Sequence, residues 1–402
     1  MSCADLVHLQ TAVVARYGQC SVPGLVPETP PLEAGLIAVS YRRVRHDVHS
    51  SLRCVLEPFD LSAISDEGIR REYAFLQRRA DATIRAVQQA YGQGRAPIAF
   101  RFVDEKRFNA QVGKEAGSYG IEMNAAVPLF NLILFSRLLT DPRLFPHLPT
   151  SGRFEIDYTL PAVVDPSDFS KRSDWKIELT GPRAFAAGTL ADLCSSFVVF
   201  HEIGHVLCGH VEGAEALEGC SHVVEFISVR DRRRVDVDRR QAWEMDADSV
   251  AATFLTTFVE ELCADAERNE RVAAMFPERA LRLERILSMA CLSLFAFFCY
   301  VDGLMRDIDL LSTHPHPVGR AHYVKDMICT VAVEKGADHA ELNRLNLEHF
   351  EIMLALLSEL NLLDRGRYWG AEFDAVDEQI DKTLERRARS REVCASWSWI
   401  AW

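Results

Sequence analysis

The sequence has few of the features that mark secreted, disulfide-bonded or nucleic-acid-binding proteins. Its 11 cysteines form no Cys-x-x-Cys pair and follow no regular spacing, which indicates reduced thiols and argues against a disulfide scaffold. Basic residues are in short supply, because 45 Lys and Arg face 58 Asp and Glu and leave a net charge of −13. Overall charge therefore gives nucleic acid no attraction, and we expect no nucleic-acid partner.

A secretory signal is also lacking. Residues 1–20 contain neither a cationic start nor a continuous apolar run, so we expect a cytoplasmic protein. Residues 286–301, ILSMACLSLFAFFCYV, carry no charge, and a helix of this length spans roughly 24 Å at ~1.5 Å per residue. Because a hydrocarbon core is about 30 Å thick, we expect a buried helix here. A membrane anchor is the alternative.

The composition is that of a globular protein, with 48% apolar and 26% charged residues. Apolar residues at steps of three and four predict helices, and alternation predicts strands. The predicted helices cover residues 64–91, 189–210, 240–267, 277–304, 318–334 and 340–363. The predicted strands cover residues 98–104 and 119–125. The fold class is therefore α+β and mostly helical, with a small sheet.

Three regions follow from this order of elements. We expect an N-terminal helical region (1–95), a central core (96–335) and a C-terminal helical region (336–402), which together form one compact unit. Thr189, with Asp192 three residues later, resembles a capping box at the start of the helix over 189–210.

That helix contains the stretch FHEIGHVLCGH, residues 200–210, with the pattern His-Glu-x-x-His. His201 and His205 are four residues apart, so on a helix they share one face, as two imidazole ligands of one Zn²⁺ must. Glu202 stands beside the first histidine, where a carboxylate can take a proton from water at the metal. The competing interpretation is a packed amphipathic helix that carries this pattern by chance.

A second motif follows in WEMDADSVAA, residues 243–252. Glu244 and Asp248 are four apart and share one face of a predicted helix, and the alanines around them allow a close approach to the first helix. We expect Glu244 to be the third zinc ligand and Asp248 to accept a hydrogen bond from a ligating histidine. The alternative is a solvated acidic stripe. His222 is a weaker candidate for the third ligand, and Cys208 is expected to be a packed thiol.

These motifs resemble the gluzincin metallopeptidases of the CaaX prenyl protease and heat-shock membrane protease group, in which the glutamate of Glu-x-x-Ala-Asp completes the zinc site. FNAQ (108–111) ahead of YGIEMNA (119–125) is similar to the family's Asn-Ala segment and the edge strand that holds substrate. THPHPVGR (313–320) is similar to its His-Pro…Arg element, and His210 stands where that family often has a histidine. The resemblance covers roughly residues 98–325 and implies a zincin-like fold, with a small antiparallel or mixed sheet beside the HEXXH helix.

Many members of that group span membranes several times, whereas this sequence offers one marginal segment. A soluble relative is the closer picture, and the general layout is similar to the cytosolic phage-exclusion Lit peptidases. The resemblance also implies a role for His314 in stabilising the oxyanion. It further implies that Asn109 and the strand of Ile121 bind the backbone of an extended substrate by β-augmentation.

Motifs and resemblance together predict a zinc metalloendopeptidase that acts on a protein or peptide substrate. One Zn²⁺ is expected, bound by His201, His205 and Glu244, with Glu202 as general base. Two alternatives stay open. One is a zinc-stabilised regulatory or structural protein without catalysis, and the other is a membrane-anchored peptidase.

Overall fold

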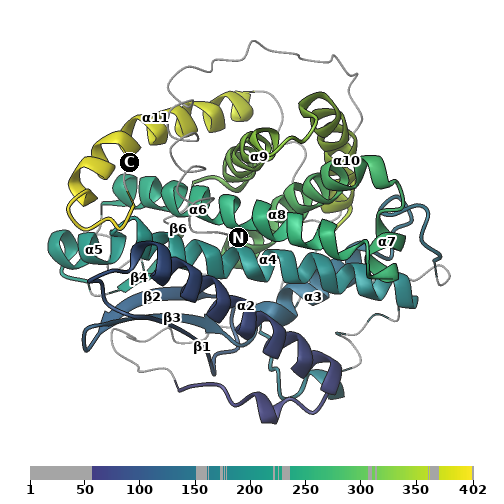
Figure 1. Ribbon diagram of the computed structural model, residues 1–402, viewed down its shortest axis with the longest axis horizontal. Helices are drawn as coiled ribbons and strands as arrows, with labels where there is room; N and C mark the ends of the chain where they lie inside the picture. Colours follow the sequence, from purple (N-terminus) through teal and green to yellow (C-terminus); the bar gives the residue numbers. More distant parts are fainter. Residues whose placement is uncertain are drawn as a thin grey trace.

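The computed structural model describes residues 57–150, most of 161–180, 181–220, 222–224, 226–228, 236–306, 310–312, 315–360, 362 and 371–400 (Figure 1). The helices are α2 (Glu67–Tyr91), α3 (Val127–Leu138), α4 (Gly181–Leu207), α5 (His210–Glu218), α6 (Val237–Asp265), α7 (Glu270–Met275), α8 (Arg282–Arg306), α9 (Pro317–Glu334), α10 (His339–Glu359) and α11 (Ala371–Cys394). The strands are β1 (Ile98–Val103), β2 (Ala110–Glu115), β3 (Ser118–Asn124), β4 (His222–Val224), β5 (Phe226–Ser228) and β6 (Leu310–Ser312). The described chain is mostly helical with a small mixed sheet, as the α+β prediction requires.

The helix that carries the histidine motif, α4, begins eight residues earlier than predicted. A proline in its first turn favours a helix start at Gly181, because proline has no amide hydrogen to lose there. The capping box predicted at Thr189 is therefore wrong. The Thr189 hydroxyl donates back to the Phe185 carbonyl at 2.9 Å, and Asp192 pairs with Arg79 of α2 at 2.6 Å.

The same helix also ends earlier than predicted. It stops at Leu207, and Gly209 takes a left-handed conformation with φ of 75°. His210 then begins a separate helix, α5, instead of ending α4. The turn between the two helices brings His210 back toward the last turn of α4.

The larger sheet has four strands in the order β1-β3-β2-β4. Strand β3 pairs in parallel with β1 and antiparallel with β2, so its backbone amides and carbonyls are used on both sides. The predicted edge strand at Ile121 is thus a central strand, and the Ile121 side chain is fully buried. The prediction that a substrate backbone pairs with this strand is wrong. Alternating side chains identified the strand but contain no information about its neighbours.

Helix α4 lies in the middle of the molecule. In Figure 1 the sheet and α2 lie below α4, and α6, α8, α9 and α11 lie above it. Helices α2 and α4 contact each other, and both contact the sheet. One continuous apolar core includes residues from Ile64 in the N-terminal part to Ile400 in the tail. Such a position explains why α4 is apolar around most of its circumference.

Two of the described helices are long and apolar enough to cross a membrane by length and composition. They are the segments Gly181–Leu207 and Arg279–Asp302, whose most apolar windows are 72% and 89% buried inside the protein. The uncharged segment 286–301 belongs to the second and packs between α4, α9 and α10. Core helices of globular proteins pass the same test of length and composition, and burial of this extent is typical of them.

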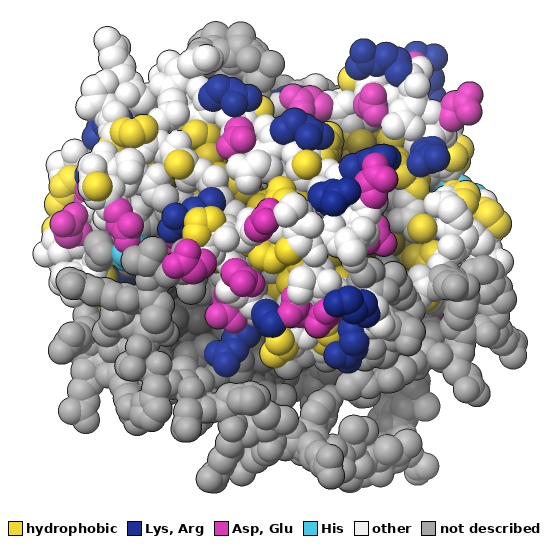
Figure 2. All heavy atoms as spheres, turned by 90° about the horizontal axis from the view of Figure 1, so that it is seen from below, with side chains coloured by type: hydrophobic (Ala, Val, Ile, Leu, Met, Phe, Trp, Pro, Cys, Tyr) yellow, Lys and Arg dark blue, Asp and Glu magenta, His cyan; other side chains and the backbone are white. Residues whose placement is uncertain are grey.

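Charges of both signs share the surface. On the face drawn in Figure 2, basic and acidic side chains are interspersed over the coloured, described residues. On the described surface as a whole, some of these charges form local ion pairs on helices, such as Arg71 with Glu67 and Arg344 with Glu341. Exposed pairs of this kind add little stability and leave the described part of this face without a large field of one sign.

Candidate metal centre

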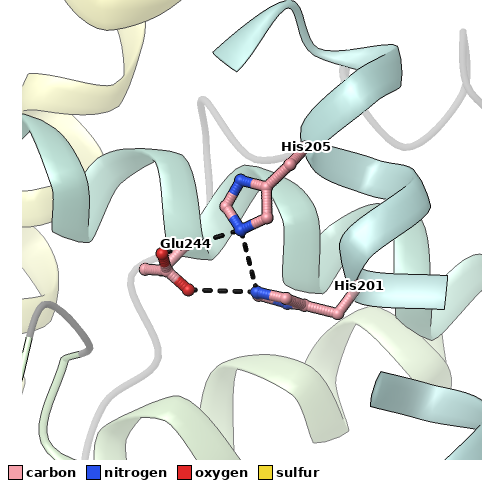
Figure 3. Close-up of side chains that lie close together, drawn as sticks. All are labelled: His201, His205 and Glu244. Carbon is pink, nitrogen blue, oxygen red and sulfur yellow. Dashed lines mark hydrogen bonds and ion pairs between the residues drawn. The ribbon is translucent and has the colours of Figure 1, made fainter. Parts of the chain in front are cut away.

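The site forms where α4 and α6 approach most closely. Gly204 of α4 faces Ala247 of α6, and a Cβ atom at Gly204 would lie 2.8 Å from the Ala247 Cα. Two helices can come this near only where both residues are small, so the glycine and alanine in the two motifs set the separation of the helix axes. This close approach places Glu244 opposite the two histidines of α4 (Figure 3).

His201, His205 and Glu244 converge on one point, as Figure 3 shows. The two histidine Nε2 atoms are 3.0 Å apart. A carboxylate oxygen of Glu244 lies 3.0 Å from Nε2 of His201, and the other lies 3.6 Å from Nε2 of His205. Atoms bound about 2.05 Å from a tetrahedral metal are about 3.3 Å from one another. The observed spacing brackets this value, so this buried group could hold a metal ion.

A buried ion pair orients the first of these histidines. The Nδ1 atom of His201 lies 2.8 Å from Asp248, which turns Nε2 toward the centre of the site. Arg320 of α9 donates to both oxygens of that carboxylate, at 2.7 and 2.8 Å. Asp248 is thus where the sequence predicts it, in contact with a histidine of the motif. The Arg320 contact shows that the aspartate also ties α9 to the site.

The second histidine has a different partner. The Nδ1 atom of His205 lies 2.9 Å from Nδ1 of His210, the first residue of α5. The His210 ring stacks on Trp243 of α6, with ring centroids 5.2 Å apart and planes inclined by 15°. Its other nitrogen lies 3.9 Å from an oxygen of Asp246. The two histidines of the motif therefore both present Nε2 to the site, but through unlike contacts.

Burial and the neighbouring charges shift the protonation of these groups in opposite directions. Burial disfavours a charge on His201, but hydrogen bonds to Asp248 and Glu244 outweigh it and raise its pKa to about 10. Burial lowers the pKa of His205 to about 4, and the charge of Glu244 offsets this only in part. Burial also opposes the charge on Asp248, yet Arg320 and His201 lower that pKa to about 2. A cation held by Glu244 and the two imidazoles would take the place of the His201 proton.

No family model, curated protein or solved structure matches this chain. The assignment of a metal centre thus rests on the geometry of His201, His205 and Glu244, and the gluzincin resemblance rests on the motif residues.

The remaining predicted residues fall in different places. Glu202 is buried on α4, next to the first histidine. Asn109 precedes β2, and its side-chain oxygen is buried with no hydrogen-bond partner among the described residues. His314 lies outside the described residues. The rival ligand His222 is on β4, 3.8 Å from Glu115, and is 37% exposed. Cys208 is buried as expected for a packed thiol.

Three residues around the site, Asp246, Arg387 and Arg391, were not predicted from the sequence. Asp246, the middle acid of the EMDAD stretch, points away from Glu244 and Asp248, because a step of two residues on a helix turns to the opposite side. Its charge partners, Arg387 and Arg391, come from α11. A pattern with three acids in five residues does signal that one of them must have a partner elsewhere, but not which residue that partner is.

Proposed function

We propose that this protein is a zinc-dependent metallopeptidase that hydrolyses a protein or peptide substrate. The observation that carries the proposal is the buried group of His201, His205 and Glu244, with Nε2 of each histidine turned toward one carboxylate. Two imidazole nitrogens and one carboxylate are a ligand set that suits Zn²⁺, and three protein ligands leave a fourth position open. An open position is what distinguishes catalytic zinc sites from structural ones.

When bound, Zn²⁺ supplies a Lewis acid that polarises a carbonyl group and makes water acidic near neutral pH. Glu202 accepts a proton from the attacking water, whose oxygen forms the new bond to the peptide carbonyl carbon. The same carboxyl then gives that proton to the leaving nitrogen as the C–N bond breaks. Asp248 and Arg320 hold the His201 ring in one orientation throughout.

The sheet topology determines where an extended substrate could pair with the protein. Because β3 is paired on both sides, an extended peptide would join the sheet at one of its edge strands, β1 or β4. Residues 57–59 already bond to the outer side of β1, so the proposed edge is β4, whose described pairing is with β2 alone. The side-chain oxygen of Asn109 is buried without a hydrogen-bond partner among the described residues, and we propose that it accepts a hydrogen bond from a substrate amide. His314 remains the proposed oxyanion donor. We place the protein in the cytoplasm, with no nucleic-acid partner.

Metal analysis and a hydrolysis assay test the proposal. Wild type and the Glu202→Gln and Glu244→Ala variants are prepared in parallel, and zinc is measured by elemental analysis. We expect about one zinc per chain in wild type and Glu202→Gln, and much less in Glu244→Ala. New amino termini are then counted after incubation with a peptide library. We expect them with wild type only, since Glu202→Gln keeps the metal but loses the base.

The same experiment separates the alternatives. Wild type without zinc, despite metal-replete preparation, would show that the motif helix is only a packed helix. Zinc in wild type and Glu202→Gln, with new amino termini from none of the samples, would favour a metal-stabilised protein without catalysis. In that case removal of zinc would unfold the chain globally, whereas a catalytic site would lose its metal with the fold retained.

A further inference from the structure

Residues 387–400 lie far along the chain from the metal-binding motifs but contact the helices that carry or adjoin them. We name Arg387–Ile400, which comprise the last two turns of α11 and the tail, the C-terminal clamp. In Figure 1 the yellow α11 lies beside α6 and α5. The clamp touches the site through two independent sets of contacts, one on α6 and one at the end of α4.

The first set begins at Asp246, whose side chain is 1% exposed. Arg387 and Arg391 of the clamp both bind one oxygen of this carboxylate, Arg391 at 2.7 Å. Arg387 also donates to the Ser249 hydroxyl at 2.6 Å and to the Tyr323 hydroxyl. One guanidinium therefore joins α11 to α6 and α9 in a buried polar network, where every lost contact is costly.

Asp246 also lies near His210, which contacts the second histidine of the motif, although no hydrogen bond joins Asp246 to the His210 ring. Its other oxygen lies 3.9 Å from Nε2 of His210, and the His210 ring is fixed on its face by Trp243. Nδ1 of His210 then lies 2.9 Å from Nδ1 of His205. With a metal bound to Nε2 of His205, the proton of that ring would be on Nδ1 and would be donated to His210, so the N–H of His210 would be on the side of Asp246.

The second set of contacts joins the tail to the turn between His205 and His210. The Leu207 carbonyl at the end of α4 accepts hydrogen bonds from the Trp399 amide at 2.8 Å and the Ser398 hydroxyl at 3.0 Å. The last carbonyls of a helix have no partner within it, so the tail supplies these donors. A Cβ atom at Gly209 would lie 2.8 Å from the Ser398 nitrogen. The clamp thus packs directly on the backbone of this turn.

We propose that the C-terminal clamp positions the metal ligand His205, through Asp246 and His210 on one side and through the 207–209 turn on the other. It serves His205 as Asp248 and Arg320 serve His201. The inference rests on the metal-binding half of the proposed function and is independent of catalysis. Partners of ligating histidines typically contribute 10- to 100-fold to metal affinity.

The test measures zinc affinity of the full chain by competition with a chromophoric chelator, together with the visible spectrum of the Co²⁺-loaded protein. Arg387→Gln is compared with Arg386→Gln, its neighbour on α11, which pairs with Asp238 at the surface. Because Arg387 acts on His205 through Asp246 and His210, we expect a smaller fall in zinc affinity, up to about 10-fold in Arg387→Gln, with an altered Co²⁺ spectrum. In Arg386→Gln both should stay as in wild type.

A milder variant guards against misfolding of Arg387→Gln. Ser398→Ala removes one of two donors to the Leu207 carbonyl, and we expect zinc affinity to fall about twofold to tenfold, the net value of one hydrogen bond. Wild-type affinity and spectrum in both Arg387→Gln and Ser398→Ala, even with lower thermal stability, would overturn the inference. Wild type that binds no zinc would overturn the metal centre as well. The test measures metal binding and does not depend on hydrolysis. A protein that binds zinc but cleaves no peptide would contradict the peptidase proposal and leave the test of the clamp unaffected.

Discussion

Replacement of Gly204 by alanine tests whether the contact between α4 and α6 builds the metal site. The new Cβ would lie 2.8 Å from the Ala247 Cα and 2.9 Å from its carbonyl oxygen. Carbon atoms in contact are about 3.5 Å apart, so α6 must retreat by roughly 0.7 Å. Metal–ligand distances tolerate only about 0.2 Å. Since Glu244 moves with α6, we expect zinc affinity to fall roughly 10- to 100-fold.

Gly188 on the same helix provides the matched control, because among the described residues no atom outside its own stretch of helix backbone lies within 4 Å of its Cβ position. Each Gly→Ala change gains about 0.8–1.0 kcal/mol of helix propensity. Only Gly204→Ala adds an overpacking cost of about 1–3 kcal/mol. The free energies of unfolding of the two variants should therefore differ by about 1–3 kcal/mol in urea titrations with a chelator present. Equal stability and equal zinc affinity of the two variants would show that the contact of Gly204 with Ala247 does not set the geometry of the site.

Three other predictions follow from buried polar groups. Asp248→Asn keeps one acceptor oxygen but removes the negative charge that His201 and Arg320 share. Competition titrations should therefore show about 10- to 100-fold weaker zinc binding, and unchanged binding would contradict the role of that charge. Arg183 donates to five backbone carbonyls between residues 139 and 149. Arg183→Met should lower the free energy of unfolding by at least about 3 kcal/mol, with little recovery in Arg183→Lys, because a compact ammonium cannot replace the fork of donors. Burial lowers the pKa of His322 to about 4, whereas a histidine in the unfolded chain titrates near pH 6.5. Between these two pH values the unfolded state binds more protons than the folded state, so the free energy of unfolding falls as the pH falls. Unfolding at pH 7 and pH 5 should show that His322→Gln loses about 2 kcal/mol less than wild type over this interval, and equal losses would count against the buried neutral state.

The sequence predicted those parts of the site that depend on a single helix. His201 and His205 share a face because they are four residues apart, and the same spacing places Glu244 and Asp248 together. The existence of α6, α8, α9 and α10 also followed from apolar periodicity, which is strong in long helices. In each case the information lies within one turn or one element of the chain.

Contacts between distant elements were not predictable in this way. Arg320 and Arg387 reach Asp248 and Asp246 only after α9 and α11 have packed on α6. The position of Ile121 depends on which strands flank β3, and alternation along one strand is the same at the centre and at the edge. Charge partners and strand neighbours that are distant in sequence are determined by the packing of whole elements, so a motif of a few residues does not predict them.

The contacts of the C-terminal clamp have a consequence for synthesis of the chain. Translation proceeds from the amino terminus, so Asp246 and the Leu207 carbonyl leave the ribosome well before Arg387, Ser398 and Trp399. Until those residues emerge, a carboxylate destined for the interior lacks its guanidinium partners and must stay hydrated. Nascent chains released before residue 387 therefore cannot close this part of the interior, and the surroundings of the centre become complete only after residues 387–399 have emerged.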